Sequence, residues 1–173
     1  MADNENDVSV EGSAARIADR GRDQMSFGEG DDRPSLGSPD VVADLVGDFC
    51  LEVIETRTKY LHDEIDPDGA KINIRLAAKK YGRIILGEDN HYLALTWHSA
   101  QRLGERIKKV IPPVKGVTHP GEQLFLTLAG SVTSISVALG EERLTDDEAK
   151  AHLLSLQEQA NKLILGMFNA DAE

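Results

Sequence analysis

Apolar residues recur at three- and four-residue spacing through most of the chain after residue 38, a pattern typical of amphipathic helices. The first such stretch follows Ser38-Pro39-Asp40, which combines a serine N-cap, a proline at the first helical position and an early acid. We expect this helix to run to about Asp66, where the turn at residues 66–69 stops it. Its buried stripe is predicted to comprise Val42, Leu45, Val46, Phe49, Val53 and Tyr60. Four acids are predicted to be solvated on its other faces: Asp44, Asp48, Glu52 and Glu55.

Residues 71–87 and 90–111 predict the second and third helices. The second opens with the alternation Ile72-Ile74-Leu76, which would suit a strand, so we expect an irregular first turn before Gly87 ends the helix. Gly82 inside it costs about 1 kcal/mol relative to alanine. The third helix ends at Pro112-Pro113, and the glycine in its apolar seam would let a neighbouring helix approach closely. That seam is Leu93, Trp97, Ala100, Gly104, Ile107 and Ile111.

Residues 118–140 allow two interpretations. A continuous apolar period predicts a helix capped by Gly140, whereas the β-rich runs in residues 123–139 would also suit a hairpin. We favour the helix because the period continues through the turn that a hairpin would need. The last helix begins with a capping box, in which Thr145 is the N-cap and Glu148 stands three residues later, and it extends to Phe168.

These patterns predict an all-α fold, a single bundle of about five helices over residues 38–170. Residues 1–37 contain few large apolar side chains and are expected to form a disordered acidic leader. Within the leader, residues 14–27 (AARIADRGRDQMSF) set Ile17, Met25 and Phe27 among arginines. We interpret this stretch as part of a solvated tail, with a short linear motif that folds on a partner as the alternative.

The composition limits the location and class of the protein. The chain has 173 residues, enough for one domain, and its single cysteine, Cys50, excludes an internal disulfide. The N-terminus is acidic and unlike a secretory signal, and no uninterrupted apolar run reaches the roughly 18 residues of a membrane span. We therefore expect a cytoplasmic protein that does not interact with membranes.

Motifs for metal binding and catalysis are incomplete. Residues 66–69 resemble the start of a calcium loop, but Lys71 and Ala77 occupy the positions that require glycine and glutamate. Glu88 and His91 have the spacing of a di-metal helical site without the second copy that such a site needs. Nucleophile-elbow, zinc-protease and phosphate-loop signatures are absent from the sequence. We expect a non-catalytic protein that needs no metal or cofactor.

Charge is unevenly distributed along a chain whose formal net charge is −11. Residues 1–69 carry 18 acids and 6 bases, and residues 117–173 carry 9 acids and 3 bases. Residues 70–116, in contrast, carry 3 acids and 10 bases. A basic middle within an acidic chain makes the second and third helices the best candidates for a binding surface.

The bases of these two helices are predicted to face outward. On the second helix they recur every fourth residue, and on the third they lie opposite the apolar seam, with one leucine in the same sector. If the two helices pack side by side, the bases share one surface, and an apolar residue within it is a common interface composition. The simpler interpretation is an ordinary solvated face paired with the acidic helices. The candidate binding residues are Arg75, Lys79, Arg83, Leu95, His98, Arg102, Arg106 and Lys109.

Three functions are compatible with these features. The first is an adaptor, regulator or inhibitor that binds a protein partner through the basic face. The second is a nucleic-acid-binding regulator that uses the same bases, although the pI of about 4.9 and the few aromatics oppose it. The third is an acidic inhibitor or polyanion mimic that neutralises a basic partner. The oligomeric state stays open, and a homodimer fits the sequence.

Overall fold

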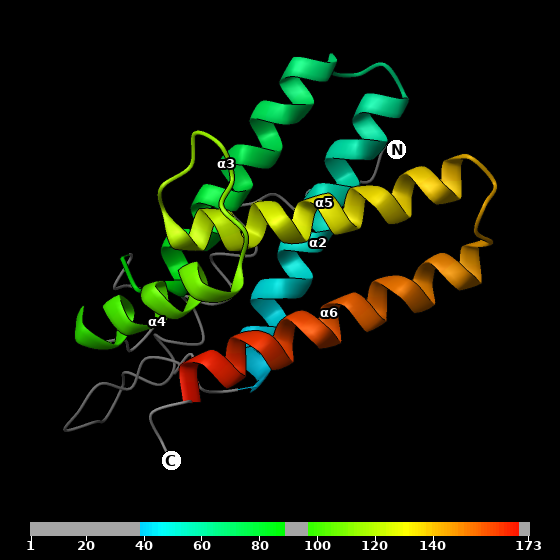
Figure 1. Cartoon of the computed structure of the whole chain (residues 1–173). Coiled ribbons are helices and arrows are strands. Elements are labelled where there is room, and N and C mark those ends of the chain that lie inside the picture. Colours follow the sequence, from blue (N-terminus) through cyan, green and yellow to red (C-terminus); the bar gives the residue numbers. More distant parts are fainter. Residues whose placement is uncertain (1–38, 89–96, 170–173) are drawn as a thin grey trace, which may run out of the picture.

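Residues 39–88 and 97–169 are described in the computed structural model, and they form five α-helices without a strand (Figure 1). This result confirms the predicted all-α bundle. The predicted leader, the Ser38 cap, Leu93 and Leu95 lie outside the described residues. The helices are α2 (Pro39–Leu61), α3 (Pro67–Ile85), α4 (Trp97–Val110), α5 (Pro120–Gly140) and α6 (Asp146–Asn169).

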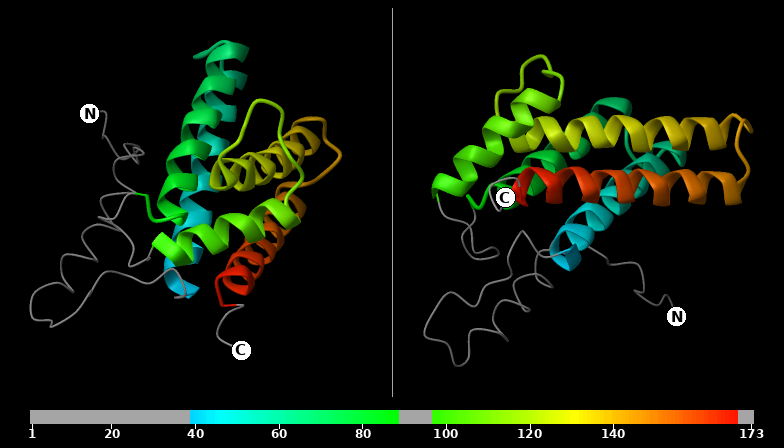
Figure 2. Two further views of the ribbon diagram at one scale, coloured as in Figure 1. Left: turned by 60° about the vertical axis from the view of Figure 1, so that its left-hand side comes forward. Right: turned by 60° about the horizontal axis from the view of Figure 1, so that its bottom comes forward.

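The helices form two antiparallel pairs that cross each other. α2 and α3 lie side by side, α5 and α6 form the second pair, and the two pairs meet at a steep angle (Figures 1 and 2). α4 packs on α5 and α6 near one end of the bundle. α5 contacts each of the other four described helices, so it is the centre of the fold.

Three aromatic rings from three helices fill the middle of the core. Phe49 of α2 contacts Tyr81 of α3 and Phe125 of α5 edge-on, with ring centroids 5.6 Å and 4.8 Å away. Tyr81 and Phe125 complete the triangle at 5.8 Å. Such edge-to-face pairs add about 0.5–1.5 kcal/mol to the burial of the rings. The predicted stripe of α2 is buried from Val42 to Val53, whereas Tyr60 is only half-buried.

The turn at residues 66–69 differs from the prediction. α2 ends at Leu61, near Asp63 in the left-handed conformation (φ 58°), and not at Asp66. Asp66 instead caps α3, because its Oδ1 accepts a hydrogen bond of 2.6 Å from the Gly69 N–H. Pro67 fits the first helical position, where a missing N–H has no consequence. Residues 66–69 therefore start α3, and α2 has already ended before them.

The prediction of an irregular first turn in α3 is also wrong, since the helix is regular from Pro67 onward. The alternation that suggested a strand results from two residues on the outer face, Ile72 and Leu76, flanking the half-buried Ile74. Gly87 follows the helix with a φ of 67°, as predicted for a C′ glycine.

Gly82 allows α3 and α5 to approach each other closely. A Cβ atom added to Gly82 would lie closer than 3.0 Å to the backbone of Gly121 and Glu122. A Cβ on Gly121 would clash with the backbone of Gly82 in the same way. The two glycines therefore let α3 and α5 touch backbone to backbone. In α4, a Cβ added to Gly104 would lie 3.5 Å from the Pro120 ring, an ordinary van der Waals contact, so this glycine is not required for a close approach.

α5 is one continuous helix, so the preferred interpretation of residues 123–139 is confirmed. It begins after His119, which is its N-cap, and Gly140 lies in its last turn and not at the cap position. Among the described helices, α5 is the one long and apolar enough to cross a membrane, with a mean hydropathy of 1.5. One such helix is weak evidence, because the core helix of a soluble protein meets the same criterion.

The capping box of α6 is confirmed. The Thr145 hydroxyl accepts a 3.2 Å hydrogen bond from the Glu148 N–H, and the Glu148 carboxylate accepts one of 2.8 Å from the Thr145 N–H. These hydrogen bonds lower the pKa of Glu148 below its ordinary value of 4.5. Further along the helix, Ile164 and Met167 are buried in the core.

Candidate functional site

The outer face of α3 carries apolar and basic side chains together. Ile72 and Leu76, one turn apart, are 57% and 60% exposed, so this side of the helix presents two neighbouring aliphatic side chains to solvent. At about 100° per residue they share a sector of about 100° with the three predicted bases of this helix. The opposite side of α3 holds the buried Tyr81 and Ile85. We call this surface the α3 outer face, and it comprises Ile72, Arg75, Leu76, Lys79 and Arg83.

The two arginines of the α3 outer face have acidic neighbours. Arg75 lies 3.9 Å from the carboxylate of Glu122, the first-turn acid of α5. Arg83 lies 3.2 Å from Glu88, and both guanidinium groups remain more than half exposed. The Arg83–Glu88 pair is exposed on both sides, and such pairs contribute about 0–1 kcal/mol, so a partner carboxylate competes for Arg83 at little cost. Glu122, in contrast, is mostly buried. Lys79 is exposed between the two arginines.

Glu88 also connects the end of α3 to the start of α5. The Nε2 atom of His119 bonds to the Glu88 carboxylate, and its Nδ1 atom accepts a 3.2 Å hydrogen bond from the Glu122 N–H. With Nδ1 as an acceptor, Nε2 carries the proton and donates it to Glu88. The cluster of Arg83, Glu88 and His119 therefore stabilises the α3–α5 junction.

The predicted residues of α4 have mixed positions. The Arg102 guanidinium donates a 2.7 Å hydrogen bond to His98, and both side chains are exposed. Arg106 is half-buried and donates a 2.6 Å hydrogen bond to the carbonyl of Met167, so it holds α4 against the end of α6. Lys109 is exposed. Leu95 falls outside the described residues, so the apolar residue expected among these bases has no described position.

In the described residues α3 and α4 each pack on α5, with at most a minor contact between them. The candidate residues therefore divide into an α3 group and an α4 group. The apolar component that Leu95 was expected to supply is present on the α3 outer face, as Ile72 and Leu76. The sequence contained a signal for these two residues, since each lies three positions before a base of the same stripe.

A buried acid lies between α2 and α3, contrary to the prediction that Glu52 is solvated. Glu52 is 7% exposed, and its carboxylate accepts hydrogen bonds from the Tyr81 hydroxyl at 2.6 Å and Lys80 Nζ at 3.0 Å. Its position three residues after Phe49 places it on the buried side of α2, which was the available signal. The adjoining cleft has a volume of about 420 Å³. There, burial raises the pKa of Glu55, with Lys59 opposing and Glu52 adding to the effect.

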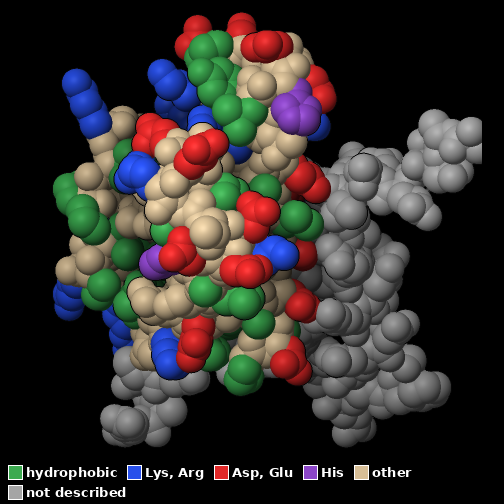
Figure 3. Space-filling model, turned by 90° about the vertical axis from the view of Figure 1, so that its right-hand side faces the viewer, with side chains coloured by type: hydrophobic (Ala, Val, Ile, Leu, Met, Phe, Trp, Pro, Cys, Tyr) green, Lys and Arg blue, Asp and Glu red, His purple; other side chains and the backbone are tan. Residues whose placement is uncertain are grey.

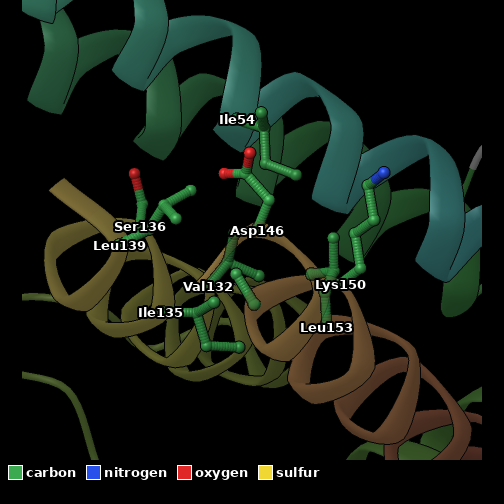
Figure 4. A pocket seen from close by; sticks show the side chains of 9 residues that line it. Ile54, Val132, Ile135, Ser136, Leu139, Asp146, Lys150 and Leu153 are labelled. Atoms are coloured by element: carbon green, nitrogen blue, oxygen red, sulfur yellow. The ribbon is translucent and has the colours of Figure 1, made fainter. Parts of the chain in front are cut away.

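A second hollow lies between α2, α5 and α6, and we call it the α2–α5–α6 groove (Figure 4). Its volume is about 240 Å³, and Ser136, Asp146 and Lys150 are its polar lining residues. Figure 4 shows Ile54 of α2 facing Asp146, with the aliphatic side chains of α5 below them. The apolar lining residues are Ile54, Val132, Ile135, Leu139, Ala149 and Leu153.

The described residues contain no group of three or more His, Cys, Asp or Glu side chains arranged to hold a metal ion. Cys50 is fully buried, and burial raises the pKa of its thiol to about 12. The chain matches no protein-family model, no curated protein and no solved structure.

Proposed function

We infer that the protein is a non-catalytic interaction protein that binds an acidic, partly apolar segment of a protein partner through the α3 outer face. The observation that carries this proposal is the pair Ile72 and Leu76, which expose most of their aliphatic surface beside three bases. Burying such a side chain against a partner contributes about 1.5–3 kcal/mol. While Ile72 and Leu76 stay solvated, they contribute no comparable stabilisation to the bundle.

The mixture of apolar and basic groups favours a protein partner over nucleic acid. Phosphate contacts need bases alone, whereas Ile72 and Leu76 have no complementary group on a phosphate backbone. A peptide helix with leucines beside glutamates would complement both kinds of group. The α4 group, with Arg102 and Lys109 exposed, provides a second basic surface for comparison.

The acidic-inhibitor alternative is less favoured. It invoked a solvated row of acids on α2, but Glu52 is buried and bonded to Lys80 and Tyr81. A carboxylate committed to these partners offers no charge to a basic protein.

The test compares two charge-matched variants in a pull-down from native lysate. Replacing Arg75 and Lys79 with glutamate changes the α3 outer face, and replacing Arg102 and Lys109 with glutamate makes the same charge change on α4. The proposal predicts that the α3 variant loses its bound protein at least tenfold while the α4 variant keeps it. Loss only in the α4 variant, or in neither, would contradict the proposal.

Salt and apolar substitutions separate protein from nucleic acid as the partner. Binding to the α3 outer face should weaken with salt but persist, because salt does not weaken the contribution of Ile72 and Leu76. Replacing both Ile72 and Leu76 with serine should then abolish the binding that persists at high salt. A complex that survives the serine substitutions but vanishes with salt or nuclease would identify a nucleic acid and reject the proposed partner class.

A further inference from the structure

The α2–α5–α6 groove is an apolar surface with an acidic border. Leu139, one of its lining residues, is among the exposed large hydrophobic residues of the described chain. Asp146, Ala149 and Lys150 line the groove just after the α5–α6 turn, and residues 141–150 as a whole carry five acids and two bases. One of those bases, Arg143, is already paired with Glu141 at 2.7 Å. Figure 3 views the molecule from this side and shows acidic and hydrophobic side chains interspersed over it.

An occupant that matches this surface must combine large apolar side chains with positive charge. Residues 14–27 of this chain have that composition, since they contain Ile17, Met25 and Phe27 together with three arginines and two aspartates. Residues 1–38 as a whole carry nine acids and four bases, so residues 14–27 are a basic stretch within an acidic region. Their charge is opposite to that of the border of the groove.

The length of the connecting chain is compatible with this match. Ile54, which lines the groove, lies 15 residues after Pro39, a distance of about 22 Å along α2 at about 1.5 Å per residue. Residues 28–38 span at most about 36–40 Å when extended. The connection is therefore longer than the path it must cover and short enough to keep the segment at a high local concentration.

We propose that the α2–α5–α6 groove binds residues 14–27 of the same chain, with Ile17, Met25 and Phe27 in the apolar hollow and the arginines against the acids of the α5–α6 turn. The groove and the α3 outer face are different surfaces. The proposal is therefore independent of the function inferred above.

The test places a nitroxide label on the full chain through the substitution Gly28→Cys. Cys50 does not interfere, because it is buried and its thiol pKa is raised to about 12. The proposal predicts strong loss of amide signal intensity at Ile135, Leu139 and Leu153, with Lys79 on the α3 outer face unaffected. Equal signal loss at all of these positions, or none at the groove, would overturn the proposal.

Three variants and one mixture make the result specific. Replacing Ile17, Met25 and Phe27 with serine should restore the groove signals, whereas replacing Val8 and Val10 with serine should not. Arg16→Glu, Arg20→Glu and Arg22→Glu together should restore them as well. The mixture combines isotope-labelled chains lacking the nitroxide with unlabelled chains carrying it. Signal loss there would assign the occupant to a second copy and reject binding within one chain.

Discussion

At the scale of single residues, Glu52 shows how the core tolerates an acid. A carboxylate removed from water without partners costs several kcal/mol, so its two hydrogen bonds are a condition of the packing between α2 and α3. The Lys80 ammonium supplies one and the Tyr81 hydroxyl the other. Tyr81 also belongs to the aromatic triangle, so one side chain serves both the apolar and the polar parts of the core.

The substitution Tyr81→Phe should lower the free energy of unfolding by about 1.5–3 kcal/mol, because it removes a hydrogen bond to a buried charged group. The ring contacts with Phe49 and Phe125 are preserved, so the loss reports the hydroxyl alone. Urea unfolding followed by circular dichroism measures the change. Tyr60→Phe, at a half-buried ring, is the control and should change stability by less than about 0.5 kcal/mol. Equal effects in the two variants would contradict this account of Glu52.

Glu148 makes the start of α6 sensitive to acid. Its folded pKa is lowered, so its stabilising contribution is complete above the ordinary value of 4.5 and is lost as pH falls through the lower folded value. The substitution Glu148→Gln should therefore reduce the loss of stability between neutral and acid pH. Thermal unfolding across that range checks the prediction, with Glu142→Gln as the control. An unchanged pH dependence in the Glu148 variant would exclude this role.

At the scale of elements, the crossing of α3 and α5 determines how the two helix pairs fit together. Gly82 was expected to weaken its helix by about 1 kcal/mol. The structure explains that cost, since only glycine leaves room for the backbone of Gly121 and Glu122. The same holds for Gly121 in the first turn of α5.

Gly82→Ala and Gly121→Ala should each lower the free energy of unfolding by about 1–3 kcal/mol, because the added methyl group must push the two backbones apart. Gly130→Ala is the matched control within α5, where an added Cβ meets nothing within 4 Å. It should raise stability by about 0.5–1 kcal/mol through its better helix propensity. Denaturant titration of the three variants measures these opposite signs. A stabilised Gly82 variant would show that the crossing tolerates a side chain.

The number and type of helices were predictable because the evidence for them is local. The apolar period of residues 118–140 and the capping box at Thr145 each lie within a few residues of the structure they specify. The boundary near Asp66 was not predicted correctly, because Asp-Pro stops one helix as readily as it starts the next. Choosing between these roles requires knowing at which residue α2 stops packing against the core.

The candidate site was less predictable, because its charge pattern depends on residues far apart in sequence. Glu88 meets His119 across 31 positions, and Glu122 of α5 lies beside Arg75 of α3. Neither contact has a spacing that a helix pattern would reveal. The exposure of Ile72 and Leu76 likewise depends on which side of α3 meets α2 and α5.

At the scale of the whole molecule, the described helices present two surfaces of different character. The α3 outer face combines aliphatic groups with bases, and the α2–α5–α6 groove lies beside residues 141–150, in which acids outnumber bases. Opposite charge on two apolar surfaces limits the binding of one partner at both sites, since a segment that complements one is repelled by the other. The two proposals therefore predict different occupants and are tested by different substitutions.

The contact between Gly82 and Gly121 has a consequence for the order in which the chain folds. α2 with α3, and α5 with α6, are neighbours in sequence, so each pair closes a short loop, and we expect its contacts to form first. The glycine contact joins residues from different pairs and requires both helices to be formed and aligned first. We expect the two pairs to assemble separately and to dock in the rate-limiting step, with the glycine contact formed only once they meet.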